Sequence, residues 1–322
     1  MQELDFDKTQ RGLVQKVKVH NDTPMSLRGM AFNTRMPPYD DIRVREALTY
    51  LFNRKLLIEK LFYNEFVPLN SYYAGWVYEN PSNPKNEYNP ALALKLLADA
   101  GWKDRDAQGH LVKNGQPLTF EVLYDFKSME PFLTTYQDDL RKVGIGLNLR
   151  LVTPETQFQL VMERKFDVSQ QAWGGLVFPN PDTSFSSKLA GVNNTNNITG
   201  FKDKRVDELL DLYDKEFDQH KRIAIIREID GILANAHHYI LEWDMPFQRI
   251  AYWNKFGYPD GYLTRTGDYT DMPWLWWIDP QKEQQLNQAM ADSTKKLPIE
   301  PVDIMYWPEY DKRAAQPAPA GK

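Results

Sequence analysis

The residues best suited to recognition chemistry lie in the segment QQAWGGLVFPNPDTSF, at 170–185. A strand-like run ends at Trp173, and Gly174 and Gly175 follow it before two prolines stiffen the exit. A tryptophan ring offers a face for a ligand, and glycine lets a ligand approach the backbone closely. The pattern also fits a sharp turn with Trp173 in the core, but two glycines and two prolines favour a pocket rim.

Titratable residues elsewhere show no recognisable catalytic or metal-binding pattern. Glu242 and Asp244 could serve a glycosidase as acid and base, but they lie in one strand-like segment. His237 and His238 are adjacent, so their side chains diverge, and no third ligand accompanies them. We therefore expect no enzyme, no metal site and no cofactor.

Composition excludes several classes of protein. The 322 residues carry a net charge of -5, which argues against a general nucleic-acid binder. No run of about 18 apolar residues occurs, so no membrane span is expected. The absence of cysteine excludes disulfides and thiolate chemistry. The 9 Trp, 17 Tyr and 16 Phe fit either core packing or a cleft lined with rings.

Strand and helix periodicities alternate along the middle of the chain. The predicted elements are strands at 118–126, 147–152 and 167–173 and helices at 129–143, 154–164, 203–217 and 219–236. This alternation is typical of a mainly parallel sheet flanked by helices. The helix at 203–217 has one apolar face, formed by Val206, Leu209, Leu210, Tyr213 and Phe217.

The remaining segments receive simpler predictions. Two short strands flank a turn within 13–34, a structured loop fills 64–88, and a hairpin occupies 109–118. Two strands joined by a turn at Pro246 follow the last of the predicted helices. Beyond residue 256 the chain looks irregular except for a helix in DPQKEQQLNQAMADS, and the predicted disordered tail is 311–322.

Five segments, in this order, resemble the extracellular solute-binding proteins of peptide-type ABC importers (family 5). They are GMAFNTRMPPYDDIRVREAL, YNPALALKLLADAGW, LRKVGIGLNLRLV, KFDVSQQAWGGLVFPNPDTSF and NNITGFKDKRVDELLD. The resemblance implies an α/β fold of the periplasmic-binding-protein type (type II), with a mixed, mainly parallel sheet in the lobe present. Two lobes of such a receptor close like a hinge over the ligand.

The resemblance also implies a division of the chain. Residues 1–40 would be a remnant of the first lobe and a hinge strand, and 41–245 the second, ligand-binding lobe. Residues 246–310 would return through the hinge to the first lobe. We expect a partial chain that lacks most of the first lobe and the leader.

The implied function is that of the substrate-binding component of an ABC importer. Such a protein captures a small peptide or similar ligand and delivers it to the permease subunits. The expected location is periplasmic or extracellular, with or without a lipid anchor, and the expected state is a monomer. The alternative is a carbohydrate-active enzyme or an oligosaccharide-binding protein with a Trp-rich cleft.

The resemblance assigns site residues to the Trp-centred loop, which faces the ligand cleft in this family. Trp173, Gly174 and Gly175 match it directly, and Phe178 and Asn180 follow in the same loop.

A second polar loop, NNTNNITG at 193–200, contains Asn197. It can donate amides into the cleft or form a solvated turn that caps the next helix. We include Asn197 among the predicted ligand-binding residues.

Two departures from the family pattern bear on the ligand. Leu176, Val177 and Phe178 stand where peptide-binding members place an acid for the peptide amine, and Gln170 and Gln171 replace a cation. These changes indicate a more neutral or a longer ligand, either a peptide or an oligosaccharide-like molecule.

Overall fold

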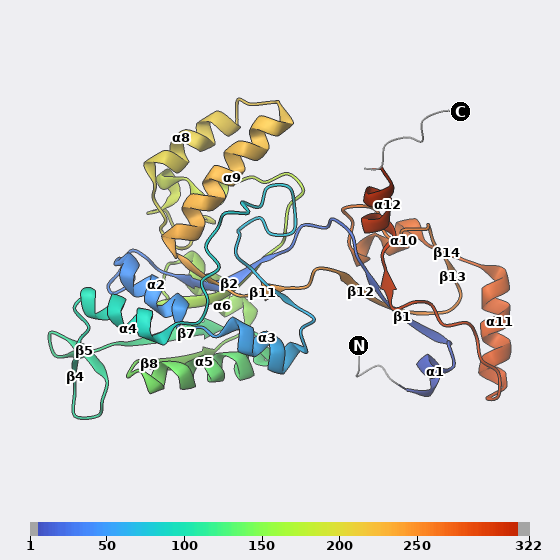
Figure 1. Cartoon of the computed structure of the whole chain (residues 1–322), viewed down its shortest axis with the longest axis horizontal. Coiled ribbons are helices and arrows are strands. Elements are labelled where there is room, and N and C mark those ends of the chain that lie inside the picture. The colour runs from blue at the N-terminus through green and yellow to red at the C-terminus, as the bar shows by residue number, and fades with distance from the viewer. Residues whose placement is uncertain (1–5, 315–322) are drawn as a thin grey trace. The chain divides into compact units, whose positions relative to one another are not determined.

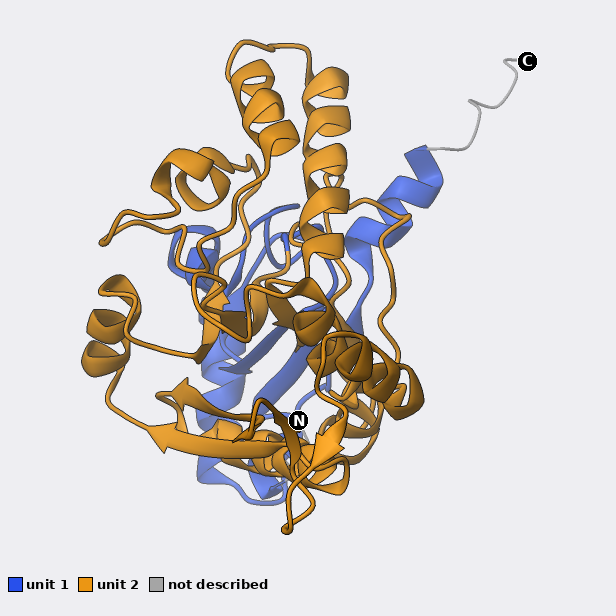
Figure 2. Ribbon diagram, turned by 90° about the vertical axis from the view of Figure 1, so that its left-hand side faces the viewer, with its two compact units in different colours: residues 1–24, 245–322 blue, residues 25–244 orange. Residues whose placement is uncertain are grey.

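The computed structural model describes residues 6–314, which form two compact units (Figures 1 and 2). Unit 1 combines the chain up to Pro24 with the chain from Met245, and unit 2 is Met25–Asp244. The chain therefore passes between the units twice. Within the described part of the chain, no helix is both long enough and apolar enough to cross a membrane.

A five-stranded mixed sheet forms the middle of unit 2, with strand order β10-β2-β9-β7-β8. Its strands β2, β7 and β8 are labelled in Figure 1. The strands are β10 (Tyr239–Leu241), β2 (Leu27–Phe32), β9 (Val168–Trp173), β7 (Thr119–Tyr124) and β8 (Gly146–Leu151). β7 runs parallel to β8 and β9, whereas β2 is antiparallel to its neighbours β9 and β10. The predicted mixed, mainly parallel sheet is thus confirmed.

Helices cover both faces of this sheet, because side chains of a strand point alternately to opposite sides. Met30, Phe120 and Val122 belong to a buried cluster with one helix set, and Ala31 and Leu123 belong to a second cluster with the other set. The first set is α2 (Ile42–Tyr50), α3 (Arg54–Phe62), α4 (Pro90–Asp99) and α5 (Glu130–Lys142). The second is α6 (Pro154–Met162), α7 (Asp182–Phe185), α8 (Lys204–Tyr213) and α9 (Gln219–Ala236).

Helix α8 ends at Tyr213, earlier than the periodicity predicts. Phe217 lies beyond this end and is 90% exposed, so its assignment to the apolar face is wrong. The Glu216 carboxylate accepts hydrogen bonds from the backbone N–H groups of Phe217 and Asp218, and Asp218 then caps α9. This local bonding forms a turn in place of a last helical turn.

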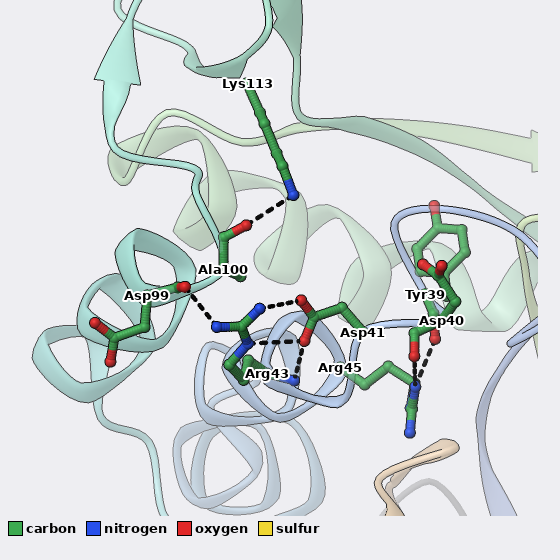
Figure 3. A network of polar contacts seen from close by, with 8 residues as sticks. All are labelled: Tyr39, Asp40, Asp41, Arg43, Arg45, Asp99, Ala100 and Lys113. Carbon is green, nitrogen blue, oxygen red and sulfur yellow. Dashed lines mark hydrogen bonds and ion pairs between the residues drawn. The ribbon is translucent and has the colours of Figure 1, made fainter.

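Charged side chains join the first turn of α2 to the end of α4 (Figure 3). Asp41 caps α2 by accepting from the Arg43 backbone N–H at 3.0 Å. The Arg43 guanidinium donates to the carbonyl of Asp99 at 2.5 Å, and Lys113 donates to the carbonyl of Ala100 at 2.8 Å. Cations at a helix C-terminus satisfy its free carbonyls and oppose the helix dipole.

Arg45, in the segment Val44-Arg45-Glu46-Ala47 of α2, also binds backbone carbonyls. Its side chain is buried and donates to the carbonyls of Tyr39 at 2.6 Å (Figure 3) and of Ala236 at 2.9 Å. Ala236 is the last residue of α9. One arginine therefore links helices from opposite faces of the sheet.

The long loop after α3 is structured, as predicted, and a buried carboxylate fixes it. It contains β3 (Val67–Pro68), which pairs with β11 (Trp243–Asp244). The Asp230 carboxylate on α9 accepts from Ser71 Oγ, from the backbone N–H groups of Tyr72 and Asn80, and from Asn83 Nδ2, at 2.8–2.9 Å.

The predicted hairpin is confirmed as β5 (Leu111–Lys113) and β6 (Gln116–Pro117), with β4 (Asp104–Arg105) beside β5. Asn114 and Gly115 make its turn with φ values of 53° and 75°. Asn and Gly are the residues that tolerate these left-handed conformations in a two-residue hairpin loop.

Unit 1 contains a three-stranded sheet with order β12-β1-β15. Its strands are β1 (Val14–Val19), β12 (Gln248–Trp253) and β15 (Asp303–Ile304), and its other elements are α1 (Asp7–Gln10), β13 (Phe256–Gly257), α10 (Met272–Leu275), β14 (Trp277–Ile278), α11 (Pro280–Ala291) and α12 (Tyr306–Ala314). Neither β1 with β2 nor β11 with β12 forms a hairpin, because each partner is supplied by a distant part of the chain.

Two predictions for the C-terminal part are corrected. The segment after residue 256 holds further short elements besides α11, and residues 311–314 continue α12 rather than beginning a disordered tail. The rest of that predicted tail lies outside the described residues. The assignment of chain segments to receptor lobes stays a prediction, and β2, assigned to 1–40, lies within unit 2.

We predict that Asp230→Ala lowers the free energy of unfolding by about 3 kcal/mol, because it leaves several buried donors without an acceptor. Asp138→Ala, at a half-exposed position of α5 that pairs with the exposed Arg141, should change it by less than about 0.5 kcal/mol. Urea denaturation of both variants measures this. Equal stabilities would show that Asp230 does not hold the loop.

Candidate ligand-binding site

A pocket of about 430 Å³ opens where β7 and β9 end. It is lined by Arg28, Asp125, Phe126, Ser128, Met129, Pro154, Gln157, Phe158, Val161, Met162, Gln170, Gln171, Ala172 and Trp173. Ligands of open α/β sheets bind outside the carboxyl ends of the strands, and this volume is in the range of small-ligand sites. The position makes this pocket the candidate site of unit 2.

The pocket exists because β7 and β9 separate. They pair at only two positions, the second of which is Leu123 with Ser169. Beyond it, the buried Gln157 side chain of α6 donates from Nε2 to the Leu123 carbonyl at 3.2 Å and to the Gln170 carbonyl at 2.8 Å. The amide thus satisfies carbonyls of both strands where a strand ladder would otherwise have continued.

Apolar side chains form much of the pocket wall. Phe126 is 61% exposed and Phe158 is 66% exposed, so both rings are accessible. Trp173 is partly buried, packs beside the second core cluster and donates from Nε1 to Tyr239 Oη at 3.2 Å. Its ring therefore contacts the core with one part and lines the pocket with another.

The loop after Trp173 is anchored through two of its carbonyls. Val177 accepts from Trp76 Nε1 at 3.2 Å, and Pro179 accepts from Tyr213 Oη at 3.0 Å. Both donors come from outside the loop, so its course is fixed although its surface is exposed.

Most of the predicted site residues lie in this loop, which directly follows Trp173. A Cβ atom at Gly174 would meet nothing within 4 Å, so open space lies beside Trp173 there, as predicted. Gly175 and Asn180 are exposed, and Phe178 is 72% exposed. Of the loop residues and Trp173, however, only Trp173 lines the pocket.

Asn197 is placed apart from the others. It is fully buried, and its Nδ2 donates to the carbonyls of Ser186 and Phe201 at 3.0 and 2.9 Å. Its Oδ1 accepts from the Gly200 N–H at 3.0 Å. These bonds use its amide to shape its own loop, so we remove Asn197 from the candidate site.

Charged groups at the pocket were missed by sequence reasoning. Arg28 Nε lies 3.4 Å from Asp244 Oδ1, and Asp244 also accepts from the backbone N–H of Ser26 at 2.7 Å. Asp125 follows the last residue of β7, and partial burial raises the pKa of its carboxyl. Its place directly after a parallel strand is the signal that could have identified it.

Gln170 faces a buried acid. Its Nε2 donates to Glu242 Oε2 at 3.4 Å, and Glu242 is 2% exposed. Burial raises the pKa of Glu242 to about 7, although Gln170 and the cation of Arg28 both act to lower it. Neither Glu242 nor Asp244 lines the pocket, so they form no acid–base pair there.

The two histidines are buried at the end of α9. Burial lowers the pKa of His237 to about 4 and that of His238 well below its ordinary value. His238 Nδ1 lies 3.3 Å from Tyr72 Oη. Among residues 6–314, no three His, Asp or Glu side chains are arranged to hold a metal ion.

We predict that Trp173→Ala lowers the free energy of unfolding by about 1–2 kcal/mol, because only part of the ring packs on the core. Trp243→Ala is the matched control. Trp243 is 4% exposed, and its loss should cost about 3–5 kcal/mol. Chemical denaturation compares them, and an equal loss for both would place Trp173 fully in the core.

We predict a pH dependence that Glu242→Gln removes. Because the folded state holds a proton on Glu242 more tightly than the unfolded chain does, the contribution of Glu242 to wild-type stability falls as pH rises from about 4.5 to about 7. The neutral isostere lacks this loss and should be more stable by about 3 kcal/mol above pH 7.

Unfolding free energies measured at several pH values test this effect. His237 and His238 contribute with the opposite sign below their unfolded pKa, and both contributions cancel in the difference between the two proteins. A difference that is independent of pH would contradict the expectation.

Comparison with known proteins identifies the family. Residues 4–196 match the model of the bacterial extracellular solute-binding proteins, family 5, middle part. The uncharacterized protein YejA of Escherichia coli K12 is 26% identical over 319 residues, which covers 88% of this chain and 52% of YejA.

Solved structures show the same fold. AppA of Bacillus subtilis, solved with a nonapeptide, has a TM-score of 0.72 at 22% identity, covering 83% of this chain and 52% of AppA. NikZ of Campylobacter jejuni, solved with Ni(L-His), has a TM-score of 0.71 at 18% identity, covering 84% and 54%. The chain spans about half the length of these proteins. Because the family model matches more than half of its residues, the chain belongs to the bacterial extracellular solute-binding proteins of family 5.

Proposed function

We propose that this chain is part of the substrate-binding component of an ABC importer and that it contacts a peptide in the pocket at the ends of β7 and β9. The observation that carries the proposal is the pocket itself, in which rings and amides meet at the carboxyl edge of the sheet. Family membership supports the receptor role, and the bound nonapeptide of AppA supports a peptide ligand. Delivery to permease subunits and a periplasmic or extracellular location belong to the same proposal.

The lining of the pocket favours a peptide over the other ligands considered. Among the described residues that line it there is no histidine, which disfavours a nickel–histidine complex such as that bound by NikZ. Asp125 is the one carboxylate in that lining, whereas a glycosidase needs two flanking the scissile bond. These features support a binding protein without catalytic activity.

The same lining indicates how a peptide would be held. Phe126, Phe158 and Trp173 offer apolar surface for side chains. The absence of an acid directly after Trp173 removes the amine contact that the resemblance implies for peptide-binding members. We therefore propose that the pocket recognises residues along the peptide and does not clamp both of its termini. We also propose that the protein acts as a monomer.

The test is calorimetric titration of the chain with blocked peptides, acetyl-Ala-Xaa-Ala-amide, in which Xaa is Leu, Lys or Glu. We expect at least one to bind, and Trp173→Ala to weaken its binding about tenfold through lost ring contact. Trp274→Ala is the control, because Trp274 is 87% exposed in unit 1 and does not line the pocket.

Nickel with histidine and a neutral trisaccharide serve as competing ligands in the same assay. Binding of either of them, without binding of any peptide, would overturn the proposal. Unchanged peptide affinity in Trp173→Ala would remove this tryptophan from the site.

A further inference from the structure

The Asp125 carboxylate stands in the pocket without a cation. Asp125 is partly buried; burial raises the pKa of its carboxyl, and the backbone N–H groups of Asp125 and Phe126 act to lower it. Among the described residues, no Lys, Arg or His nitrogen lies within 4.0 Å of them. A carboxylate withdrawn from water without a counter-charge retains the capacity to bind a cationic donor.

The three glutamines and the one arginine of the pocket lining are already engaged within the protein. Gln157 and Gln170 donate to the groups described above, and Gln171 Nε2 donates to Ser169 Oγ at 2.9 Å. Arg28, the one cation of the lining, has the carboxylate of Asp244 3.4 Å away. The negative charge of Asp125 is thus the uncompensated charge of the described lining.

The surroundings of Asp125 suit a cation carried on an apolar stem. Phe126 and Phe158 expose their rings, and Met129 adds a flexible apolar side chain. Aromatic faces attract ammonium and guanidinium groups, and apolar walls accommodate the methylene stem that carries them. A ligand carboxylate would meet repulsion from Asp125 instead.

We propose that Asp125 binds a positively charged group of the ligand, so that the pocket selects peptides bearing an ammonium or guanidinium group over neutral and acidic ones. The group is either the peptide's amino terminus or a Lys or Arg side chain. This inference rests on the proposed peptide-binding function and names the ligand chemistry of that same site.

The experiment is titration of the chain with four peptides. Acetyl-Ala-Lys-Ala-amide, acetyl-Ala-Leu-Ala-amide and acetyl-Ala-Glu-Ala-amide vary only the central charge. Unblocked Ala-Leu-Ala-amide adds a terminal ammonium to the neutral sequence. We expect a cationic peptide to bind at least about tenfold more tightly than the neutral blocked one, and the preference to shrink in 1 M salt.

Two variants assign the preference to Asp125. Asp125→Asn keeps the size of the side chain and should reduce the preference to less than about twofold, while Asp125→Glu retains most of it. Asp138→Asn is the matched control, because Asp138 is half-exposed on α5, pairs with Arg141 at 2.9 Å and lies outside the pocket. Thermal melting confirms that each variant is folded.

The outcomes separate this inference from the proposed function. Equal binding of neutral and cationic peptides, tightest binding of the glutamate peptide, or a preference that survives in Asp125→Asn overturns the inference and leaves the peptide-binding function standing. Binding of no peptide overturns both. Tighter binding of the lysine peptide alone identifies the side chain as the source of the charge. Tighter binding of the unblocked peptide alone identifies the amino terminus.

Discussion

The separation of β7 from β9 is the constraint on which the site of unit 2 depends. Parallel strands that stayed paired would close the edge of the sheet, but here the ladder stops at Leu123 and Ser169. Gln157 satisfies carbonyls of both strands beyond that point, so the gap does not leave buried acceptors without donors. One side chain of α6 thus replaces the hydrogen bonds that the separated strands do not make with each other. The pocket lies in the space between these strand ends.

Elsewhere in unit 2, buried charged side chains join elements that are distant in sequence. Arg45 connects α2 to the end of α9, and Asp230 on α9 fixes the loop that leads from α3 to α4. These bonds use buried charges against backbone groups, which are strong when desolvated and costly to lose. Ligand-binding surfaces need such support, because a loosely held wall spends binding energy on its own ordering.

Periodicity predicted the local elements of the chain, and it could not predict what pairs with what. The alternation of periodicities from 118 to 173 correctly predicted the order β7-α5-β8-α6-β9, because amphipathic spacing depends only on residues close together in sequence. The partners of β1 and β10 lie far along the chain, so no local signal reveals them. The predictions for Phe217 and Asn197 were wrong for a related reason. Each residue fits a plausible sequence pattern, but a local turn at Glu216 exposes Phe217. Hydrogen bonds within the 193–200 loop and to its neighbours occupy the Asn197 amide.

Burial depth, rather than residue type, distinguishes the two carboxylates near this pocket. Glu242 and Asp125 are both acids near the same edge of the sheet, yet only Asp125 lines the cavity. Glu242 lies beneath Gln170, where desolvation keeps it partly protonated near neutral pH. Asp125 is only partly buried, and this partial burial raises the pKa of its carboxyl. A sequence shows two carboxylates, whereas the fold buries one of them beside Gln170 and leaves the other in the lining of the pocket.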